Sequence, residues 1–489
     1  MANARWSAGD VRYLGIPLRG ARAAVVGIGV ENTPLVEFLA RHGAQVTACD
    51  GKEADALEAY RRLGSLPVHW SLGPGYLEPL VREAFDFVFL TPGLIKDRPE
   101  IKAAKARGAR ITGQVDLFLS LCPAPVIGIT GSSGKSTTTS LLGDILAAGG
   151  APVHVGGNIG RVLLPDLPAI EAGHQVVLEL SSFQLELVHR SPQTAVLLNI
   201  RPNHLDIHGS FEAYREAKAN IARHQGPDDF FVFAAHEPEA AAVAGQTPAR
   251  LVAFGPEPPV PPPDAPADHW SRRLHGWAAV VDGQIVFQRG GEREVIMPVA
   301  EVPLMGRHNL ANVLAAVAVG RLRGIDPAAM AGAITAFRPL EHRLEPVVTW
   351  RGVEFYNDSV ATAPDRTAAA LAAFDRPIVL LAGGYDKGIP FNGLGRHILA
   401  RPVRAVVLLG DTAGAIAEAI AAAARAAGKE APPVLMAGDL AEAVRLGAEA
   451  ARPGDVVLFS PACSSYDMFP SFAVRGRRFK EEVKKLAAS

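Results

Sequence analysis

A glycine-rich turn followed by lysine and serine is the clearest chemical signal in the chain. It consists of Thr130, Gly131, Ser132, Ser133, Gly134, Lys135, Ser136 and Thr137. Glycines let backbone N–H groups close around phosphate oxygens, Lys135 would neutralise the β- and γ-phosphates, and Ser136 would ligate Mg²⁺. The strict Gly-x-x-x-x-Gly-Lys template does not fit, because five residues separate Gly128 from Gly134. The turn is therefore a variant that predicts bound nucleoside triphosphate, and an ordinary strand-to-helix turn is the alternative.

Polar residues follow two apolar runs downstream of this turn. Glu179 ends one run and Asn199 ends the next. Ligands of open parallel sheets bind at the carboxyl ends of strands, so an acid such as Glu179 could bind Mg²⁺ beside the turn. A helical segment at 211–221 then brings in Lys218. For His204, taken alone, helix capping is the favoured alternative to metal binding.

Alternating strands and helices must position these groups. A strand at 23–29, a helix at 34–42 and a strand at 44–49 that ends in Asp50 predict a βαβ unit, and the alternation continues to Ile111. A second series begins at Val126 and includes strands at 176–180 and 194–199, which should lie beside the glycine-rich turn in one parallel sheet.

The rest of the chain predicts a loop, a hairpin and a third α/β region. Proline excludes helix and interior strand at 254–265, and Asp282-Gly283 predicts a hairpin turn within 278–287. Helices are expected at 309–322 and 413–427, and further strands at 353–356, 378–382, 405–409 and 456–459. The predicted fold is α/β with three domains: a Rossmann-like N-terminal domain (1–122), a central P-loop ATPase-like parallel-sheet domain (123–337) and a C-terminal Rossmann-like α/β domain (338–489).

Composition excludes several classes of protein. The 49 basic and 50 acidic residues leave a net charge of −1, which argues against nucleic acid and anionic membranes as partners. Three scattered cysteines argue against a disulfide framework or a zinc site. Residues 1–6 lack the apolar core of a signal peptide, and no apolar run is long enough for membrane insertion. We expect a cytoplasmic monomer.

Seven motifs, in this order, resemble those of the Mur ligases of peptidoglycan synthesis. They are Thr130-Gly131-x-x-Gly134-Lys135-Ser136, Glu179–Gln184, His204-Leu205-Asp206, Lys218, Gly306–Asn309 with Asn312, His342-Arg343 and Asn357-Asp358-Ser359. Within that family, Gly383–Gly388 and Leu458–Phe469 most resemble the branch that adds glutamate to UDP-N-acetylmuramoyl-L-alanine. The resemblance implies that ATP converts a substrate carboxylate to an acyl phosphate, which the amino group of the amino acid then attacks.

The resemblance also implies roles for individual residues. Those implied in catalysis are Lys135, His204, Lys218 and Arg343. Those implied in ATP binding are residues 130–137, Asn309, Asn312, Arg343 and Asp358. Those implied in holding two Mg²⁺ ions are Ser136, Glu179, His204 and a carbamylated Lys218. Those implied in binding UDP-N-acetylmuramoyl-L-alanine or glutamate are Gly29, Asp50, Thr91, Pro92, Gly93, Asn158, Thr362, Lys387, Ser465 and Phe472. Residues of separate domains would meet at ATP, so we also expect domain closure.

The chain departs from the family pattern at several positions. Val360 stands where the family has a lysine, and Met468 replaces a usual glutamine, which puts the recognition and stereochemistry of glutamate in doubt.

The N-terminal pattern Gly27-x-Gly29-x-x-Asn32 lacks the third glycine of a dinucleotide fingerprint, and a glycine turn needed only for packing is its alternative. Three functional alternatives stay open: a related ligase for another amino acid, including L-glutamate; a folylpolyglutamate-type ligase; and a non-catalytic nucleotide-binding protein.

Overall fold

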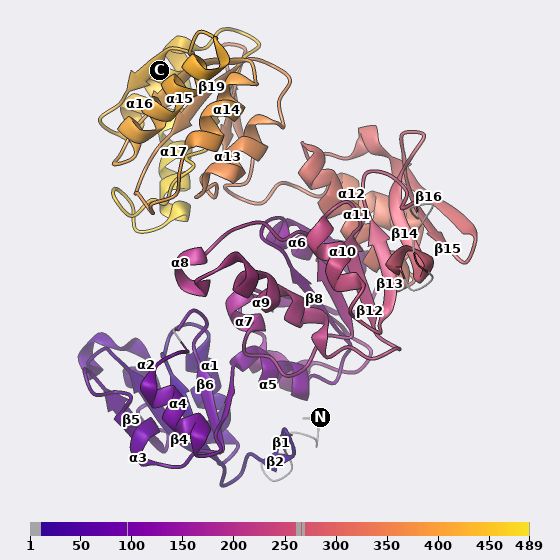
Figure 1. Cartoon of the computed structure of the whole chain (residues 1–489), viewed down its shortest axis with the longest axis vertical. Helices are drawn as coiled ribbons and strands as arrows, with labels where there is room; N and C mark the ends of the chain where they lie inside the picture. Colours follow the sequence, from indigo (N-terminus) through magenta and orange to yellow (C-terminus); the bar gives the residue numbers. More distant parts are fainter. Residues whose placement is uncertain (1–10, 95, 261–265, 267–268, 489) are drawn as a thin grey trace. The chain divides into compact units, whose positions relative to one another are not determined.

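The computed structural model describes residues 11–94, 96–260, 266 and 269–488 (Figure 1). The chain forms two compact units. The first unit contains the residues up to Val302 together with Ala311–Phe337. The second unit contains Pro303–Leu310 and the residues from Arg338 onward. The segment 1–6, in which no signal peptide was predicted, lies outside the described residues, as does part of the predicted proline-rich loop. Within that loop, residues 255–260 form neither helix nor strand.

The first part of unit one is a parallel sheet with the strand order β5-β4-β3-β6-β7. The glycine turn predicted after the first strand follows β3, and Asp50 ends β4 as predicted. The elements are β1 (Arg12–Tyr13), β2 (Ile16–Pro17), β3 (Arg22–Val26), α1 (Asn32–Arg41), β4 (Gln45–Asp50), η2 (Ala54–Ala56), α2 (Glu58–Leu63), β5 (Val68–Leu72), α3 (Glu78–Arg82), β6 (Phe87–Leu90), α4 (Pro99–Ala106), β7 (Arg110–Thr112) and α5 (Gln114–Leu121).

The second part of unit one is a nine-stranded sheet with the order β16-β15-β14-β13-β12-β11-β8-β10-β9. Strand β8 lies between β10 and β11 and is parallel to both, which confirms the predicted neighbours of the glycine-rich turn. The elements are β8 (Val126–Thr130), α6 (Lys135–Ala148), β9 (Val153–Gly157), η3 (Leu164–Ala169), β10 (Gln175–Glu179), α7 (Ser182–Leu185), β11 (Thr194–Leu197), α8 (Leu205–His208), α9 (Phe211–Arg223), β12 (Phe230–Ala234), α10 (Pro238–Ala244), β13 (Arg250–Phe254), η4 (Trp270–Arg272), β14 (Leu274–Val281), β15 (Gln284–Arg289), β16 (Glu292–Pro298), η5 (Val299–Glu301), α11 (Arg307–Leu322) and α12 (Pro327–Ala336).

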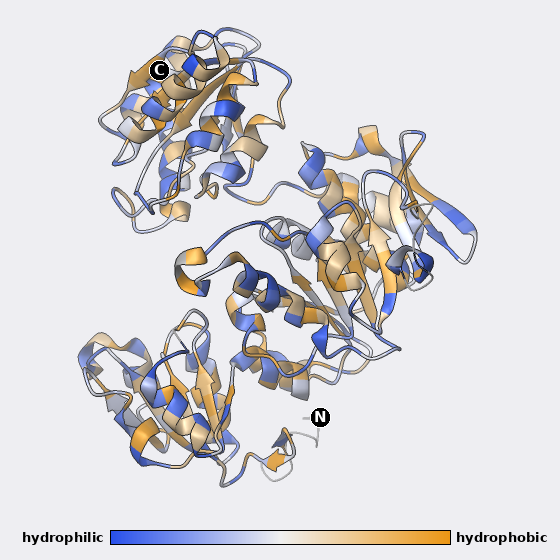
Figure 2. Ribbon diagram, viewed as in Figure 1, coloured by the Kyte–Doolittle hydropathy of each residue, from blue (hydrophilic) through white to orange (hydrophobic). Residues whose placement is uncertain are grey.

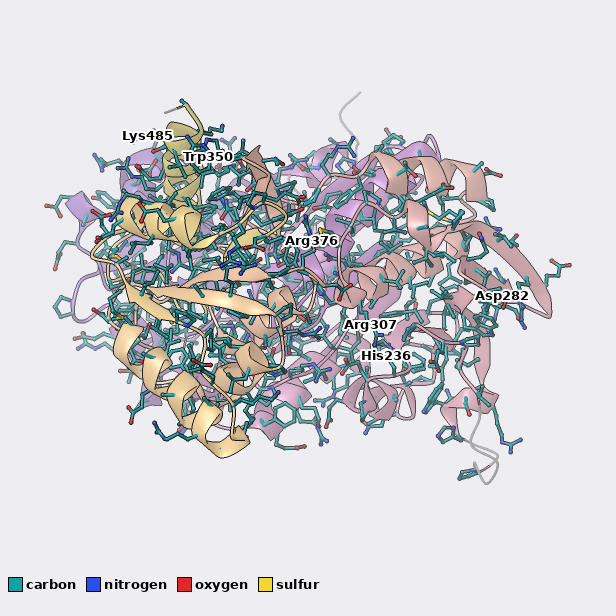
Figure 3. All side chains as sticks on the ribbon, turned by 90° about the horizontal axis from the view of Figure 1, so that it is seen from above. His236, Asp282, Arg307, Trp350, Arg376 and Lys485 are labelled. Atoms are coloured by element: carbon teal, nitrogen blue, oxygen red, sulfur yellow. The ribbon has the colours of Figure 1, made fainter. Side chains whose placement is uncertain are left out.

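This central sheet is mixed, whereas the sequence prediction described it as parallel. Asp282 and Gly283 both have positive φ, 48° and 73°, as a two-residue hairpin turn requires. That turn reverses the chain, so β15 and β16 add antiparallel to the edge of the sheet. Asp282 marks the turn in Figure 3. Strands β9, β12 and β13 also join the sheet, although no strand was predicted there.

Unit two contains a six-stranded sheet with the order β17-β18-β22-β19-β20-β21. Only β17 is antiparallel to its neighbour. The elements are β17 (Glu345–Trp350), β18 (Val353–Asn357), α13 (Pro364–Leu371), β19 (Ile378–Ala382), α14 (Asn392–Leu399), β20 (Val403–Leu408), α15 (Ala413–Ala427), β21 (Val434–Met436), α16 (Leu440–Ala450), β22 (Val456–Phe459) and α17 (Phe472–Ala488).

Both faces of the sheet in unit two are covered by helices, so its two middle strands, β22 and β19, are apolar throughout (Figure 2). Leu380 packs in one core with residues of α13, α14 and α15, and the next residue, Leu381, packs in a second core with residues of α16 and α17. Alternation of side chains along a strand explains this division. The predicted α/β class is confirmed. No helix in the described ranges is long and apolar enough to cross a membrane.

Candidate active site

The glycine-rich turn joins β8 to α6 in the first unit. Gly134 has φ 83°, in the left-handed region, and a Cβ there would collide with Oδ1 of Asn312. Gly128 lies inside β8, where a Cβ would stand 2.6 Å from Pro192. The unusual spacing is thereby explained, because Gly128 serves strand packing and the turn itself begins at Gly131.

Neighbouring strand ends hold the turn by hydrogen bonds. Thr130 Oγ1 donates to the Leu180 carbonyl at 2.8 Å, just beyond β10. The Ser133 N–H donates to Asn199 Oδ1 at 3.0 Å, just beyond β11. A phosphate-binding turn needs backbone N–H groups held in place before the ligand arrives, and these contacts supply that order.

The two lysines predicted for catalysis meet at one oxygen of the turn. Lys135 Nζ and Lys218 Nζ each lie 2.9 Å from the Gly131 carbonyl oxygen. Lys218 is 1% exposed, donates also to Thr130 Oγ1 at 3.4 Å, and lies 4.8 Å from the centre of the Tyr214 ring. Helix α9 therefore carries a buried amine to the edge of the phosphate turn.

Glu179, at the end of β10, fits a cation. Its side chain is buried, and Oε1 accepts a 2.8 Å hydrogen bond from Asn158 Nδ2. Oε2 is buried and has no hydrogen-bond partner among the described residues. An unsatisfied buried carboxylate oxygen is costly unless a ligand meets it, and Mg²⁺ prefers such hard oxygen ligands. Ser136 lies in the first turn of α6, which follows the neighbouring strand β8. Its hydroxyl is also a hard oxygen ligand.

Protein side chains alone do not make a metal cage here. The described part of the chain contains no cluster of three or more histidine, cysteine, aspartate or glutamate residues suited to a metal. Mg²⁺ usually takes one or two carboxylates and completes its shell with phosphate oxygens and water, and Glu179 with Ser136 offers donors of this kind. The donor set therefore fits a metal that arrives with a nucleotide.

Asn158 was predicted to lie near the muramoyl substrate, and the structure shows it bonded to Glu179. We expect Asn158→Ala to raise the Mg²⁺ concentration needed for half-maximal activity by about 10-fold, because removing an amide that orients a ligating carboxylate weakens metal binding. A Mg²⁺ titration of activity measures this. Arg161→Ala, a nearby exposed change, should leave the titration unaltered. Unchanged Mg²⁺ dependence with a raised KM for the muramoyl substrate would instead favour direct contact with that substrate.

His204 lies at the start of α8, where its φ of 54° is unusual for a residue with a side chain. It is the N-cap residue of α8, as the capping alternative expects, but its side chain makes no capping hydrogen bond to this helix. The imidazole packs edge-on against Phe183 at 5.2 Å. Phe183 also stacks on His208, which contacts Glu186 at 2.8 Å. His204 is thus held beside α7, the helix that follows Glu179.

The N-terminal glycine turn gathers three of the predicted substrate-binding segments. Gly27 has φ 80°, and a Cβ there would stand 2.5 Å from Thr91 Cγ2, so packing does require this glycine. Asp50 accepts hydrogen bonds from the Ile28 N–H at 2.7 Å and the Lys52 N–H at 2.9 Å. The residues predicted to hold the uridine diphosphate, Gly29, Asp50, Thr91, Pro92 and Gly93, follow or end the adjacent strands β3, β4 and β6.

A buried arginine joins two loops of unit two that contain predicted substrate residues. Arg475 is 1% exposed and donates to the carbonyls of Ser359, Cys463 and Ser464 at 2.9–3.0 Å, and to Ser359 Oγ at 3.1 Å. The sequence prediction missed this residue, because an arginine in a charged C-terminal helix gives no signal of burial. The Tyr385 N–H bonds to the Ser464 carbonyl at 3.0 Å, which adds the 383–388 segment to the same group of loops.

The predicted glutamate-binding residues differ in exposure. Ser465 is buried, Thr362 is half-buried, and Lys387 and Phe472 are exposed. Among the predicted adenine contacts, Asn309 donates to the Met305 carbonyl at 2.7 Å in unit two. Asn312 is buried against Gly134 in unit one. Arg343 is placed in unit two, where its charge acts on Asp358.

Asp358 is buried after β18, where Oδ2 accepts from Ser460 Oγ at 2.8 Å and Oδ1 from the Leu344 N–H at 3.2 Å. Burial raises the pKa of Asp358 to about 7, against the opposing effects of these hydrogen bonds and of the charges on Arg343 and Arg366. A raised acid pKa means that the folded chain binds the proton more tightly. Stability is therefore lost as pH rises from the pKa of the unfolded chain, about 3.9, to about 7.

Asp358→Asn should accordingly stabilise unit two in a pH-dependent manner. The gain in unfolding free energy should be about 2 kcal/mol larger at pH 8 than at pH 5.5, since each pKa unit is worth about 1.4 kcal/mol and about 1.5 units lie in that window. Urea denaturation at both pH values measures it. Asp365→Asn, an exposed change nearby, should show no such difference. An equal gain at both pH values would contradict ionisation of Asp358 as the cause.

Family models match along most of the chain. The Mur ligase MurD-like N-terminal domain matches residues 21–113, the Mur ligase middle domain residues 129–320, and the Mur ligase glutamate ligase domain residues 342–463. The glycine-rich turn, Glu179 and Lys218 fall in the middle domain, and Asp358, Lys387 and Arg343 in the third.

Relatives of similar length carry one name. A UDP-N-acetylmuramoylalanine–D-glutamate ligase of Symbiobacterium thermophilum is 47% identical, with 95% of this chain and 98% of the relative covered. One of Acetivibrio thermocellus is 39% identical over 96% and 98%. Two solved structures share the fold: a pseudomurein peptide ligase of Methanothermus fervidus and a MurF ligase of Thermotoga maritima. Each has a TM-score of 0.56, is 18% identical and covers 96% of this chain. The match covers 100% of the first of these proteins and 96% of the second. The chain therefore belongs to the Mur ligase family, in the group with a MurD-like N-terminal domain.

Proposed function

We propose that this chain is an ATP-dependent ligase that joins D-glutamate to UDP-N-acetylmuramoyl-L-alanine in peptidoglycan precursor synthesis. The structural observation that carries the proposal is the convergence at the phosphate turn. Lys135 and Lys218 both donate to the Gly131 carbonyl, and the neighbouring strand ends in Glu179, whose Oε2 has no hydrogen-bond partner in the described part of the chain. Similarity over the full length to ligases of that name supports it. A non-catalytic nucleotide-binding protein would not need Lys218 buried beside the turn.

Mur ligases use ATP and Mg²⁺. ATP supplies the phosphoryl group, and Mg²⁺ neutralises the negative charge of the phosphates. In the proposed reaction, the turn holds the phosphates and Lys135 leaves the Gly131 carbonyl to meet the β- and γ-phosphates. Ser136 and Glu179 hold one Mg²⁺. His204 and Lys218, carbamylated and therefore anionic, hold a second. Arg343 and Asp358 contribute to ATP binding from unit two, with Asn309 and Asn312 at the adenine.

The muramoyl substrate and glutamate take the remaining predicted residues. The uridine diphosphate meets the glycine turn and the strand ends that carry Gly29, Asp50 and Thr91. Glutamate meets Thr362, Lys387, Ser465 and Phe472.

We also propose the domain boundaries 1–122, 123–337 and 338–489. They are supported by the end of one sheet at Thr112, the start of the next at Val126 and the division of the compact units near Phe337.

Phosphate release tests the proposal directly. The chain is incubated with ATP, Mg²⁺ and UDP-N-acetylmuramoyl-L-alanine, and each amino acid of a panel that contains both glutamate enantiomers is added in turn. Release that depends on D-glutamate, with the ligated product seen by mass spectrometry, is the expected result. Release with L-glutamate or another amino acid alone would make the chain a related ligase, and no release with any would favour a nucleotide-binding protein.

A further inference from the structure

The loop after β18 lacks the positive charge that the family pattern has there. Val360 is 8% exposed, so its short side chain is buried and contributes no charge. Its N–H donates to the His342 carbonyl at 3.2 Å, and its own carbonyl accepts from the Thr362 N–H at 2.8 Å. The backbone is therefore fixed close to Thr362, one of the residues proposed to bind glutamate.

A different cation lies at this loop. Arg366, in the first turn of α13, donates through Nη1 to the Val360 carbonyl at 3.2 Å. Its positive charge also lowers the pKa of Asp358, which precedes Ser359 in the same loop. The side chain is half-buried, and across the described residues it forms no ion pair within 4.0 Å. A guanidinium has five N–H donors in a planar fork, so most of them remain for a ligand.

A second cation would strengthen the binding of glutamate. The amino acid carries two carboxylates, and each needs hydrogen-bond donors to replace the water it loses; a charged donor makes a stronger bond to a carboxylate than a neutral one. Lys387 supplies one such charge from the 383–388 segment. Val360 cannot supply the other, whereas Arg366 can pair with a carboxylate through two parallel hydrogen bonds.

We propose that Arg366 is a specificity-determining residue that binds one carboxylate of the incoming glutamate, in place of the charge that position 360 lacks. This inference rests on the proposed function. It assigns recognition of the second carboxylate to α13 rather than to the loop after β18.

Steady-state kinetics of Arg366→Met test it, with Arg376→Met as the matched control. Arg376, labelled in Figure 3, pairs with Glu354 on the surface of the same unit and has no part in the proposed site. We expect Arg366→Met to raise the KM for glutamate by about 10- to 100-fold, the usual effect of losing a charged hydrogen bond, with the KM for ATP and the Tm unchanged. Arg376→Met should leave the KM for glutamate as it is.

Two further variants separate recognition from structure. In the Arg366→Met chain, Val360→Lys should recover a substantial part of the affinity for glutamate, because it returns a cation to the same loop. Arg366→Lys should retain a part of the affinity. With D-glutamine as substrate, a KM insensitive to Arg366→Met would assign the side-chain carboxylate to Arg366, and an equally raised KM would assign the α-carboxylate.

Three outcomes would overturn the inference. One is an unchanged KM for glutamate in an otherwise active Arg366→Met chain. Another is a parallel rise of the KM for ATP with a lowered Tm and no recovery by Val360→Lys, which would make Arg366 a structural residue. The third, absence of glutamate ligation by the unaltered chain, would remove the proposed function as well, and it is recognised before any variant is made.

Discussion

Lys218→Ala is expected to reduce ligation by at least about 10²- to 10³-fold, the cost of removing one preorganised charge-stabilising group from an active site. Lys218 is 1% exposed, and its Nζ contacts the phosphate turn at Thr130 and Gly131. As a carbamate, it would provide an anionic oxygen for Mg²⁺ where an ammonium would repel the metal. Small carboxylic acids, or bicarbonate, should partly restore the rate, because the truncated side chain leaves buried space for a free carboxylate. The measurement is phosphate release with and without added acetate or bicarbonate.

Lys218→Arg is the discriminating control. Arginine keeps the positive charge and much of the length, but its high pKa leaves no neutral amine to react with carbon dioxide. If the carbamate matters, Lys218→Arg should be as inactive as Lys218→Ala and should not respond to acetate. An active Lys218→Arg would assign Lys218 the role of a cation, and full activity of Lys218→Ala would remove it from the mechanism.

Local patterns in the sequence were sufficient to predict the elements that position the site. The apolar run that ends at Thr130, followed by glycines and Lys135, predicted β8, the turn and α6. The position of Glu179 at a strand end predicted that its side chain lies beside that turn, and the parallel pairing of β10 with β8 confirms this placement. The Asp282-Gly283 turn was confirmed as well, because its positive φ angles are a local requirement that glycine and aspartate meet.

Contacts between distant segments could not be predicted from these patterns. Asn158 and Glu179 carry no mutual signal in the sequence, yet the amide of one holds the carboxylate of the other. The sheet is mixed because β14, the first strand of the hairpin, pairs parallel with β13, while β15 pairs antiparallel with β14. The edge that β14 joins exists only once the parallel strands have folded. Arg366 is similar, since a polar residue in the first turn of a helix is ordinarily solvated, and only its contact with the Val360 carbonyl shows its place.

Arg475→Met should have the largest effect on unit two. The carbonyls of Ser359 and Cys463 lose the donor that Arg475 provides, whereas the Ser464 carbonyl keeps the Tyr385 N–H. Each buried group left unsatisfied costs about 1–3 kcal/mol. Burial lowers the pKa of Arg475 to about 10, so the guanidinium is still charged at neutral pH. Its own desolvation offsets part of the loss, because a methionine is easier to bury. We therefore expect the unfolding free energy of unit two to fall by about 3 kcal/mol, as measured by urea denaturation.

The same substitution should also weaken glutamate recognition, because Arg475 joins the loop of Ser359 to the loop of Ser464. At a temperature where the variant is folded, the KM for glutamate should rise because the residues proposed to bind it lose their mutual alignment. Arg478→Met on the same helix is the control: Arg478 is exposed and pairs with Glu482 at 2.9 Å, so its loss should cost less than about 1 kcal/mol. Equal destabilisation by the two substitutions would contradict a specific role for Arg475. A destabilised chain with an unaltered KM would limit that role to folding and place the alignment of the two loops elsewhere.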